Sequence, residues 1–348
     1  MQPASVSLIV PCHNEENYLS ALFACLDAQK VPGSTIEIIF VDGMSTDRTP
    51  AILAEYARTR PNVKVLENRD KIVPYAMNLG IRAATGELIV RIDAHAEYAP
   101  DYVAKCLEFS NSTGAENVGG AAPAKGSGYV GKSIELSHCS PFGLGGGKFR
   151  LGNFEGYVDT VFLGAFKKSV FEHIGYYDER LVRNQDIELN ARIRKAGGRI
   201  YLTPEIRSTY KCRSTLGGLW QQNFMNGVWA VYTRVIAPYT LSLRHFVPLV
   251  FVAALLVSLL IAVMPNLPLP VRIAPLAATL GSYLATSLFF SLVMAVRGGF
   301  RYFLMLPIVF AVLHLSYGIG SLWGLVTLHK WIKTQDSSCQ SRAGNCQD

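Results

Sequence analysis

Three long stretches without a charged side chain fill most of the last third of this 348-residue chain. Each is long enough for a bilayer-spanning helix, which needs roughly 20 apolar residues. Turn-forming segments separate them, PNLPLP between the first two and RGGFR before the third. We therefore predict three transmembrane helices within residues 246–328, drawn from the stretches 246–271, 273–296 and 302–328.

Charged residues gather in the preceding part of the chain. Residues 246–348 hold six Lys/Arg and two Asp/Glu, which leaves 27 and 24 in residues 1–245. Such a nearly balanced front part argues against a nucleic-acid-binding protein, which needs a basic stripe. The seven cysteines form no CxxC pair, so we expect a reducing compartment rather than a disulfide framework.

The orientation in the membrane follows from the basic residues. The N-terminal segment MQPASVSLIVPCHNEEN lacks the features of a signal peptide, so we expect it to stay cytosolic. Arginines at 234, 244, 297 and 301 would then lie on the cytosolic side, as the positive-inside rule requires. Three spans would place the basic segment 329–333 outside, against that rule, so either the tail is an exception or one span is re-entrant.

The front part alternates between apolar runs and amphipathic stretches. This alternation predicts an α/β fold, a doubly wound and mostly parallel sheet with helices on both faces. The expected domains are a catalytic domain (1–212), interfacial helices (213–245), three transmembrane helices (246–328) and a polar tail (329–348). Expected strands are 6–10, 37–41, 63–66 and 88–92, and expected helices are 18–28, 49–57 and 73–84.

Carboxylates follow three of these strands, where ligands bind in such sheets. Asp42, Asp47 and Asp93 should converge on one rim. Asp93 and His95 are two residues apart on extended chain, so both side chains can point the same way and hold Mn²⁺ or Mg²⁺ with positions open for phosphate oxygens. The alternative is a surface turn. Neither GxGxxG nor GxxxxGK[ST] is present, so any nucleotide would be held by carboxylates and metal.

Five motifs in register resemble family 2 glycosyltransferases of the GT-A fold. The narrower features DAHA, VGG, GGGKFR and RSTL are similar to the succinoglycan-biosynthesis type of bacterial membrane glucosyltransferase. The resemblance covers residues 5 to about 245. The five motifs are PCHNEE (11–16), VDGMSTD (41–47), RIDAHA (91–96), VDTVFLGAF (158–166) and RNQDIELNARIRKAGGRI (183–200).

The resemblance implies a role for each matching position. Asp186 would be the general base that deprotonates the acceptor hydroxyl, and Asp42 would hydrogen-bond the uracil. Asp93 would contact the ribose or the metal, with His95 standing where the family has a second aspartate ligand. Arg213 is a candidate for the diphosphate, or else a juxtamembrane surface charge. The residues expected to bind the donor nucleotide are Pro11, Asn14, Glu15, Asp42, Asn78 and Asp93.

Two departures from the family pattern matter. Gln185 replaces a glutamate before Asp186, and Asp186 begins an expected helix, so we expect the base to be ionised over a wide pH range. Around Gln222 the sequence reads WQQNFMNGVW, without the Arg-Trp pair of the QxxRW motif of processive synthases. This departure favours the addition of a single sugar.

We therefore expect an inverting, non-processive glycosyltransferase of the bacterial inner membrane, multi-pass and with a cytosolic catalytic domain. It would use a UDP-sugar, by resemblance UDP-glucose, with Mn²⁺ or Mg²⁺, and act in exopolysaccharide synthesis. The acceptor would be a polyprenyl-diphosphate-linked saccharide, and membrane lipids and other glycan-assembly proteins would be its partners. The alternatives are a polyprenyl-phosphate glycosyltransferase and a non-catalytic membrane scaffold with a degenerate fold. His314, an ionisable group inside the third stretch, would contact a lipid phosphate or pack against Tyr317.

Overall fold

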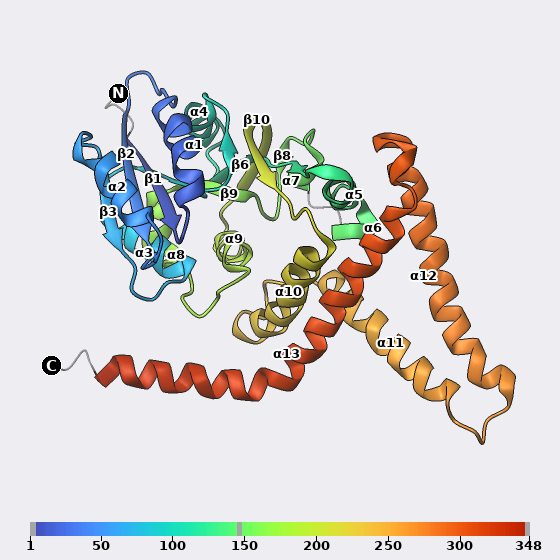
Figure 1. The fold of residues 1–348 in the computed structure, drawn as a ribbon. Coiled ribbons are helices and arrows are strands. Elements are labelled where there is room, and N and C mark those ends of the chain that lie inside the picture. Colours follow the sequence, from blue (N-terminus) through green and yellow to red (C-terminus); the bar gives the residue numbers. More distant parts are fainter. Residues whose placement is uncertain (1–4, 145–147, 345–348) are drawn as a thin grey trace. The chain divides into compact units, whose positions relative to one another are not determined.

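The computed structural model describes residues 5–144 and 148–344 (Figure 1). The chain divides into two compact units, residues 1–124 with 147–211, and residues 125–146 with 212–348. Residues 145–147 of the GGGKFR segment and the last four residues of the predicted tail lie outside the described residues. The sequence-based division at residue 212 did not anticipate that residues 125–146 group with the C-terminal helices.

The first unit is built on a mixed sheet whose first four strands are parallel neighbours, as predicted. Its order is β3-β2-β1-β4-β9-β6-β10-β5, and β7 and β8 pair with β10. Strand β9 runs antiparallel to both β4 and β6, so the sheet is parallel only in part. The strands are β1 (Ser5–Cys12), β2 (Thr35–Asp42), β3 (Val63–Glu67), β4 (Leu88–Arg91), β5 (Glu97–Tyr98), β6 (Asn117–Ala121), β7 (Ala124–Lys125), β8 (Gly156–Tyr157), β9 (Phe162–Lys167) and β10 (Ile200–Lys211).

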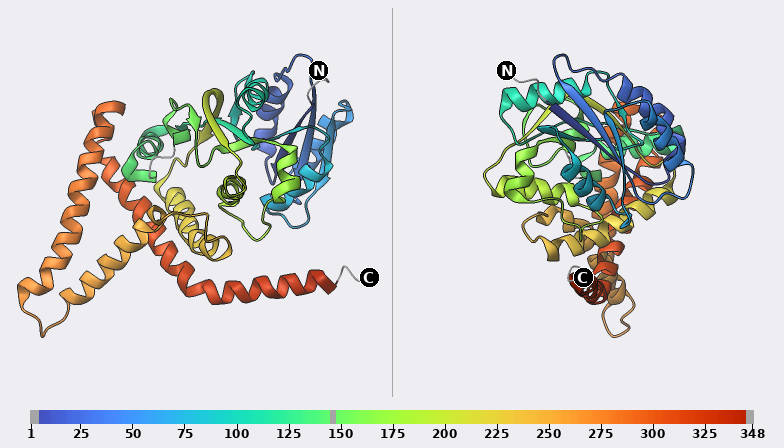
Figure 2. Two further views of the ribbon diagram at one scale, coloured as in Figure 1. Left: turned by 180° about the vertical axis from the view of Figure 1, so that it is seen from behind. Right: turned by 90° about the vertical axis from the view of Figure 1, so that its left-hand side faces the viewer.

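Helices cover both faces of this sheet, because successive strand residues point to opposite sides (Figure 2). Leu8 and Val10 belong to one apolar core, with α1 (Glu16–Asp27), α2 (Thr49–Arg58) and α4 (Tyr102–Thr113). Ile9 belongs to the other, with α3 (Val73–Ala83), α8 (Lys168–Ile174) and α9 (Gln185–Lys195). A short helix, α7 (Lys148–Leu151), completes this unit. The two buried cores fix the positions of the loops at the strand ends.

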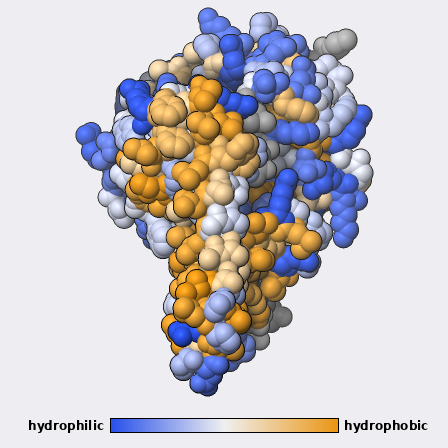
Figure 3. All heavy atoms as spheres, turned by 90° about the vertical axis from the view of Figure 1, so that its right-hand side faces the viewer, coloured by the Kyte–Doolittle hydropathy of each residue, from blue (hydrophilic) through white to orange (hydrophobic). Residues whose placement is uncertain are grey.

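The second unit consists of helices. Three of them are long and apolar enough to cross a membrane, over Leu243–Ala262, Leu269–Gly298 and Met305–Thr334. These agree with the three predicted stretches. Large apolar side chains such as Val250, Leu260 and Val296 are more than half exposed, and hydrophobic residues gather on the surface shown in Figure 3. The helices are α5 (Gly128–His138), α6 (Pro141–Leu144), α10 (Leu216–Ile236), η1 (Leu243–Phe246), α11 (Val247–Ala262), α12 (Leu269–Gly298), η2 (Phe300–Tyr302) and α13 (Met305–Gly344).

Small residues allow α10 and α13 to pack closely within the second unit. A Cβ atom on Gly227 would collide with the Tyr317 carbonyl, and one on Gly320 would collide with the Phe224 carbonyl. The Ser321 hydroxyl donates to the Gly227 carbonyl oxygen at 3.2 Å. Small residues that let two backbones approach in this way are typical of helix packing in membranes. Within the predicted interfacial segment 213–245, α10 (Leu216–Ile236) packs against α13.

Candidate active site

The loops after β1, β2 and β4 bring the predicted carboxylates together. Burial raises the pKa of the Cys12 thiol, and Glu15, Asp42 and Asp93 raise it further, because all three carboxylates lie around this residue. The Cys12 thiol is therefore held in its protonated form by burial and by the surrounding negative charge. His95 Nδ1 lies 3.2 Å from Glu15 Oε1, although the two residues are 80 positions apart. The predicted convergence of the strand ends is therefore present in the structure.

Asn14 and Asp42 are joined through the loop that follows β2. The Asn14 amide N–H donates to Ser45 Oγ at 2.9 Å, and Ser45 Oγ donates to Asp42 Oδ1 at 2.6 Å. The side-chain oxygen of Asn14 accepts from the Thr46 N–H at 2.8 Å. Asn14 has a φ of 56°, which asparagine tolerates better than most residues. These bonds hold the two predicted nucleotide-binding side chains in one arrangement.

Asp47 has a helix-capping role. Its carboxylate accepts from the Thr49 N–H at 2.9 Å, at the start of α2, and from the Glu16 N–H at 3.2 Å, at the start of α1. One carboxylate thus satisfies unpaired donors of two helices. It belongs to the predicted rim and stabilises the loops there.

Pro11 and Asn78 occupy different surroundings. Pro11 lies in β1 beside Val41 of β2. Asn78 is buried in α3, where its side chain donates to the Tyr177 carbonyl and to Glu179 Oε1, and accepts from the Tyr177 N–H, all at 2.9 Å. Asn78 therefore anchors the segment that leads toward Asp186, and its predicted contact with a nucleotide stays a prediction.

Asp186 lies in the first turn of α9 beside an arginine that the sequence analysis did not single out. Arg91 Nη1 donates to Asp186 Oδ1 at 2.5 Å, and its side chain is only 7% exposed. Burial raises the pKa of Asp186 above its usual value; Arg91 opposes this rise and Asp93 adds to it. Burial thus acts against the expectation that the base is ionised over a wide pH range, which stays a prediction.

The same arginine also contacts Asp93. Arg91 Nε and Nη2 both lie 3.2 Å from Asp93 Oδ1. A signal was present in the sequence, since Arg91 is the one charged residue of a strand that otherwise reads Leu-Ile-Val. Strand position alone did not reveal that Asp186, 95 residues later, would supply its second partner.

The donor set near Asp93 fits a cation only in part. Within residues 5–144 and 148–344, no three His, Cys, Asp or Glu side chains are grouped so that they could hold a metal ion. Asp93 and His95 could supply one carboxylate oxygen and one imidazole nitrogen. Mg²⁺ commonly binds through one or two carboxylates and takes its other ligands from water and substrate phosphates. The residues therefore fit a cation that arrives with a diphosphate.

Arg213 and His314 belong to the second unit. Arg213 is exposed and precedes α10, and its contact with a diphosphate stays a prediction. His314 Nε2 lies 2.7 Å from the Phe142 carbonyl oxygen and Nδ1 lies 3.0 Å from the Tyr283 hydroxyl. Because protein groups engage both ring nitrogens, His314 joins α6 and α12 to α13 and has no nitrogen left for a lipid phosphate.

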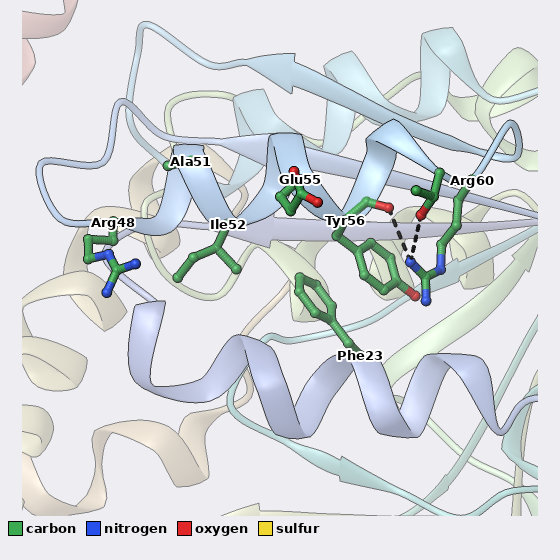
Figure 4. A pocket seen from close by; sticks show the side chains of 8 residues that line it. Phe23, Arg48, Ala51, Ile52, Glu55, Tyr56 and Arg60 are labelled. Atoms are coloured by element: carbon green, nitrogen blue, oxygen red, sulfur yellow. Dashed lines mark hydrogen bonds between the residues drawn. The ribbon is translucent and has the colours of Figure 1, made fainter.

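A cavity of about 440 Å³ lies between α1 and α2, away from these carboxylates (Figure 4). The rings of Phe23 and Tyr56 stack at 3.8 Å along it, and Arg48 and Arg60 also line it. None of the predicted site residues lines this cavity. The candidate active site is thus the group of carboxylates at the strand ends.

Comparisons with known proteins show the family of this chain. The family model described as "Glycosyl transferase family 2" matches residues 7–175. The chain is 32% identical over 222 residues to the succinoglycan biosynthesis protein ExoA of Rhizobium meliloti, covering 63% of this chain and 67% of that protein. It is 27% identical over 230 residues to a dolichyl N-acetyl-α-D-glucosaminyl phosphate 3-β-D-2,3-diacetamido-2,3-dideoxy-β-D-glucuronosyltransferase of Methanococcus voltae, covering 64% and 71%.

The fold also has a counterpart among solved structures. The mannosyltransferase PcManGT from Pyrobaculum calidifontis, in complex with GDP-Man and Mn²⁺, superposes with a TM-score of 0.55 at 20% identity. The match covers 91% of this chain and 87% of that one. At this identity the likeness concerns the fold.

Proposed function

This chain belongs to glycosyl transferase family 2, and we propose that it moves one sugar from a UDP-sugar to a lipid-linked saccharide with inversion at the anomeric carbon. The observation that carries the proposal is the Asp93–Arg91–Asp186 ion-pair chain at the carboxyl end of β4. In this proposal Asp93, on the donor side, and Asp186, which removes the proton, are bound by one guanidinium. A single displacement needs a general base for the acceptor hydroxyl and stabilisation of the charge on the leaving group.

The donor would bind over the strand ends. Asp42 and Asn14 lie at the nucleotide side in the joined loop described above, and Asp42 would accept a hydrogen bond from the uracil. Asp93 and His95 would hold a divalent cation, Mn²⁺ or Mg²⁺. When bound, that cation would offset the charge that develops on the UDP leaving group. Arg213 is a further candidate for the diphosphate.

The chemical step that we propose balances without another reactant. The acceptor hydroxyl oxygen forms a bond to the anomeric carbon while the bond from that carbon to the UDP oxygen breaks. Asp186 takes the hydroxyl proton, and UDP leaves as the anion. Attack opposite to the leaving group inverts the configuration at the anomeric carbon.

The membrane setting supports a lipid-linked acceptor. Three helices long and apolar enough to cross a bilayer would keep the enzyme at the membrane, which raises the effective concentration of a tethered acceptor. We place the protein in a bacterial inner membrane with the active site on the cytosolic side, acting in exopolysaccharide synthesis. The absence of an Arg-Trp pair after Gln222 supports the transfer of one sugar per acceptor.

The test uses membranes that contain the full chain, with UDP-[¹⁴C]glucose, Mn²⁺ and extracted bacterial lipid-linked intermediates. We expect label to enter the organic phase, and we expect Asp186→Asn to reduce the rate by at least about 100-fold. Asp159→Asn is the matched control. Asp159 is exposed and pairs with Arg194 of α9, the helix that also holds Asp186. It should transfer label at the wild-type rate.

The other outcomes separate the alternatives. Label that survives in Asp186→Asn would point to a lipid phosphate acceptor, which needs little help from a base. Parallel incubations with other UDP-sugars would identify the donor if glucose is wrong. If the wild-type chain does not bind UDP, a non-catalytic scaffold is favoured.

A further inference from the structure

We propose that Arg91 is a positioning residue that fixes the base Asp186 relative to the donor-side carboxylate Asp93. This inference rests on the proposed function, because the roles of the two carboxylates come from it. Arg91 itself need touch neither sugar. It would act by holding both carboxylates in one geometry.

Burying the charged side chain of Arg91 costs free energy unless other groups compensate for it. The residue ends β4, a central strand between β1 and β9 whose four residues are all buried. A charged side chain in such a place needs partners that compensate for its lost hydration. Asp93 and Asp186 supply them, at 3.2 and 2.5 Å.

The geometry suits an arginine and not another cation. A planar guanidinium has five N–H donors in a fixed fork, so it can bind two carboxylates along different edges at once. Arg91 Nε and Nη2 contact the Asp93 carboxylate, and Nη1 donates to Asp186. A lysine at this position would bring the charge but only one donor atom, which cannot fix two directions.

Neighbouring residues hold the arrangement in place. Tyr177 is 2% exposed, and its hydroxyl makes no hydrogen bond of normal geometry to any described residue. Its backbone is pinned by Asn78 through both the N–H and the carbonyl. Asp186 also raises the pKa of the Tyr177 hydroxyl, after burial, so the ring reaches the ion pair. Tyr177 thus lies beside Arg91 and Asp186, and Asn78 holds the backbone of Tyr177.

Arg91 engages one oxygen of the base. Asp186 Oδ1 accepts from Arg91, and no described residue bonds to Oδ2. That second oxygen is available to an acceptor hydroxyl. The inference therefore assigns Arg91 the task of presenting Oδ2 in a constant direction while Asp93 keeps its own place at the donor.

The kinetic test is a double-mutant cycle with the purified full chain in detergent. Arg91→Met should lower kcat about 100-fold in the wild-type background but no more than about 3-fold in the Asp186→Asn background, because a positioning residue has nothing to position there. Arg91→Lys should recover only part of the rate. Arg60→Met is the control, since Arg60 forms an ion pair with Asp27 at the far end of α2 and should keep kcat unchanged.

A parallel cycle reads thermal unfolding and needs no activity. Arg91→Met leaves two carboxylates without their shared partner and should lower Tm by about 5 °C or more. In the Asp186→Asn background, Arg91→Met should lower Tm by less than it does in the wild type. The Tm shifts of the two single variants should therefore not add in the double variant. Additive Tm shifts would show that Arg91 and Asp186 do not stabilise each other and would overturn the ion pair. Losses of kcat that multiply in the double mutant would show that Arg91 does not act through Asp186. A wild type that transfers no sugar would instead overturn the proposed function, while the Tm cycle would still decide the link.

Discussion

At the scale of single residues, the acidity of Asp186 is set by competition between burial and one guanidinium. Burial raises the pKa of its carboxyl, Arg91 opposes the rise and Asp93 adds to it. A general base works only when ionised, so a raised pKa moves the loss of activity on acidification to a higher pH. We expect the acidic limb of kcat, at saturating donor, acceptor and Mn²⁺, to lie at a higher pH than the usual aspartate pKa of about 3.9.

The pH profile of Asp159→Asn should match that of the wild type, since this exposed carboxylate lies outside the site. An acidic limb below pH 4 would show that the Arg91 ion pair outweighs burial. A limb above pH 7 would assign the titration to another group.

Glu37 is a second residue whose charge is fixed by its surroundings. Its Oε1 accepts from Ser7 Oγ and the Thr85 N–H, both at 2.5 Å, and its Oε2 accepts from Lys64 Nζ at 3.1 Å. Despite the opposing effect of burial, these hydrogen bonds lower the pKa of Glu37 from 4.5 to about 2. The bonds join β1, β2, β3 and the turn before β4.

The pH dependence of stability follows from that depressed pKa. Its contribution, at most about 3 kcal/mol, is present in full above pH 4.5 and is lost as the pH falls toward 2. Glu37→Gln should therefore lower Tm at pH 7 and differ little from the wild type near pH 2. Far-UV circular dichroism of the detergent-purified chain during heating measures this at both pH values. Glu55→Gln, at an exposed ion pair, should leave Tm unchanged; an equal effect of both would contradict the prediction.

At the scale of helices and strands, the glycines of the second unit make the clearest prediction. Gly320→Ala should weaken the packing of α13 on α10, because its Cβ atom would meet the Phe224 carbonyl. Gly281→Ala, in α12, has open space around the new atom and is the matched control. We expect a clear loss of Tm and of extractable folded protein for the first variant alone. Equal behaviour of the two would mean that the helices are farther apart than described.

The elements that the sequence predicted well are those with a clear local pattern. The strands β1 to β4 are short apolar runs followed by polar turns, and each was placed within a few residues of its observed bounds. The antiparallel insertion of β9 between β4 and β6 was not predicted, since nothing local in VDTVFLGAF specifies its neighbours. The grouping of α5 and α6 with the C-terminal helices was missed for the same reason. It depends on contacts such as that of Phe142 with His314, 172 residues later.

In the candidate site, too, the features with a local sequence pattern could be predicted and those that depend on tertiary packing could not. Asp42, Asp93 and His95 could be placed because each follows a predicted strand, and parallel strands bring their carboxyl ends together. The ion-pair partner of Asp186 could not, because pairing between residues 91 and 186 depends on tertiary packing. Asn78 was given a role at the nucleotide by resemblance, and that role stays a prediction; the hydrogen bonds of its side chain to the backbone of Tyr177 could not be predicted from the sequence.

At the scale of the whole molecule, the open question is how many times the chain crosses the bilayer. Three helices meet the length and apolarity needed, yet the basic segment 329–333 favours the cytosolic side. The helices differ in how much of their surface the protein covers, with 11%, 22% and 44% of their most apolar windows buried. The third, α13, is thus the one whose apolar side chains depend least on lipid.

We nevertheless expect three crossings, because residues 305–328 of α13 hold no Asp, Glu, Lys or Arg. Ile308, Leu325 and Val326 are also exposed on this helix, which suits contact with lipid. The tail would then lie across the membrane from the catalytic unit. Two variants test this, one keeping only Cys339 and Cys346 and the other only Cys25 of the catalytic unit. A membrane-impermeant maleimide should label the first in intact spheroplasts and the second only after permeabilisation. If both label only after permeabilisation, the chain crosses an even number of times and one of the three helices does not span.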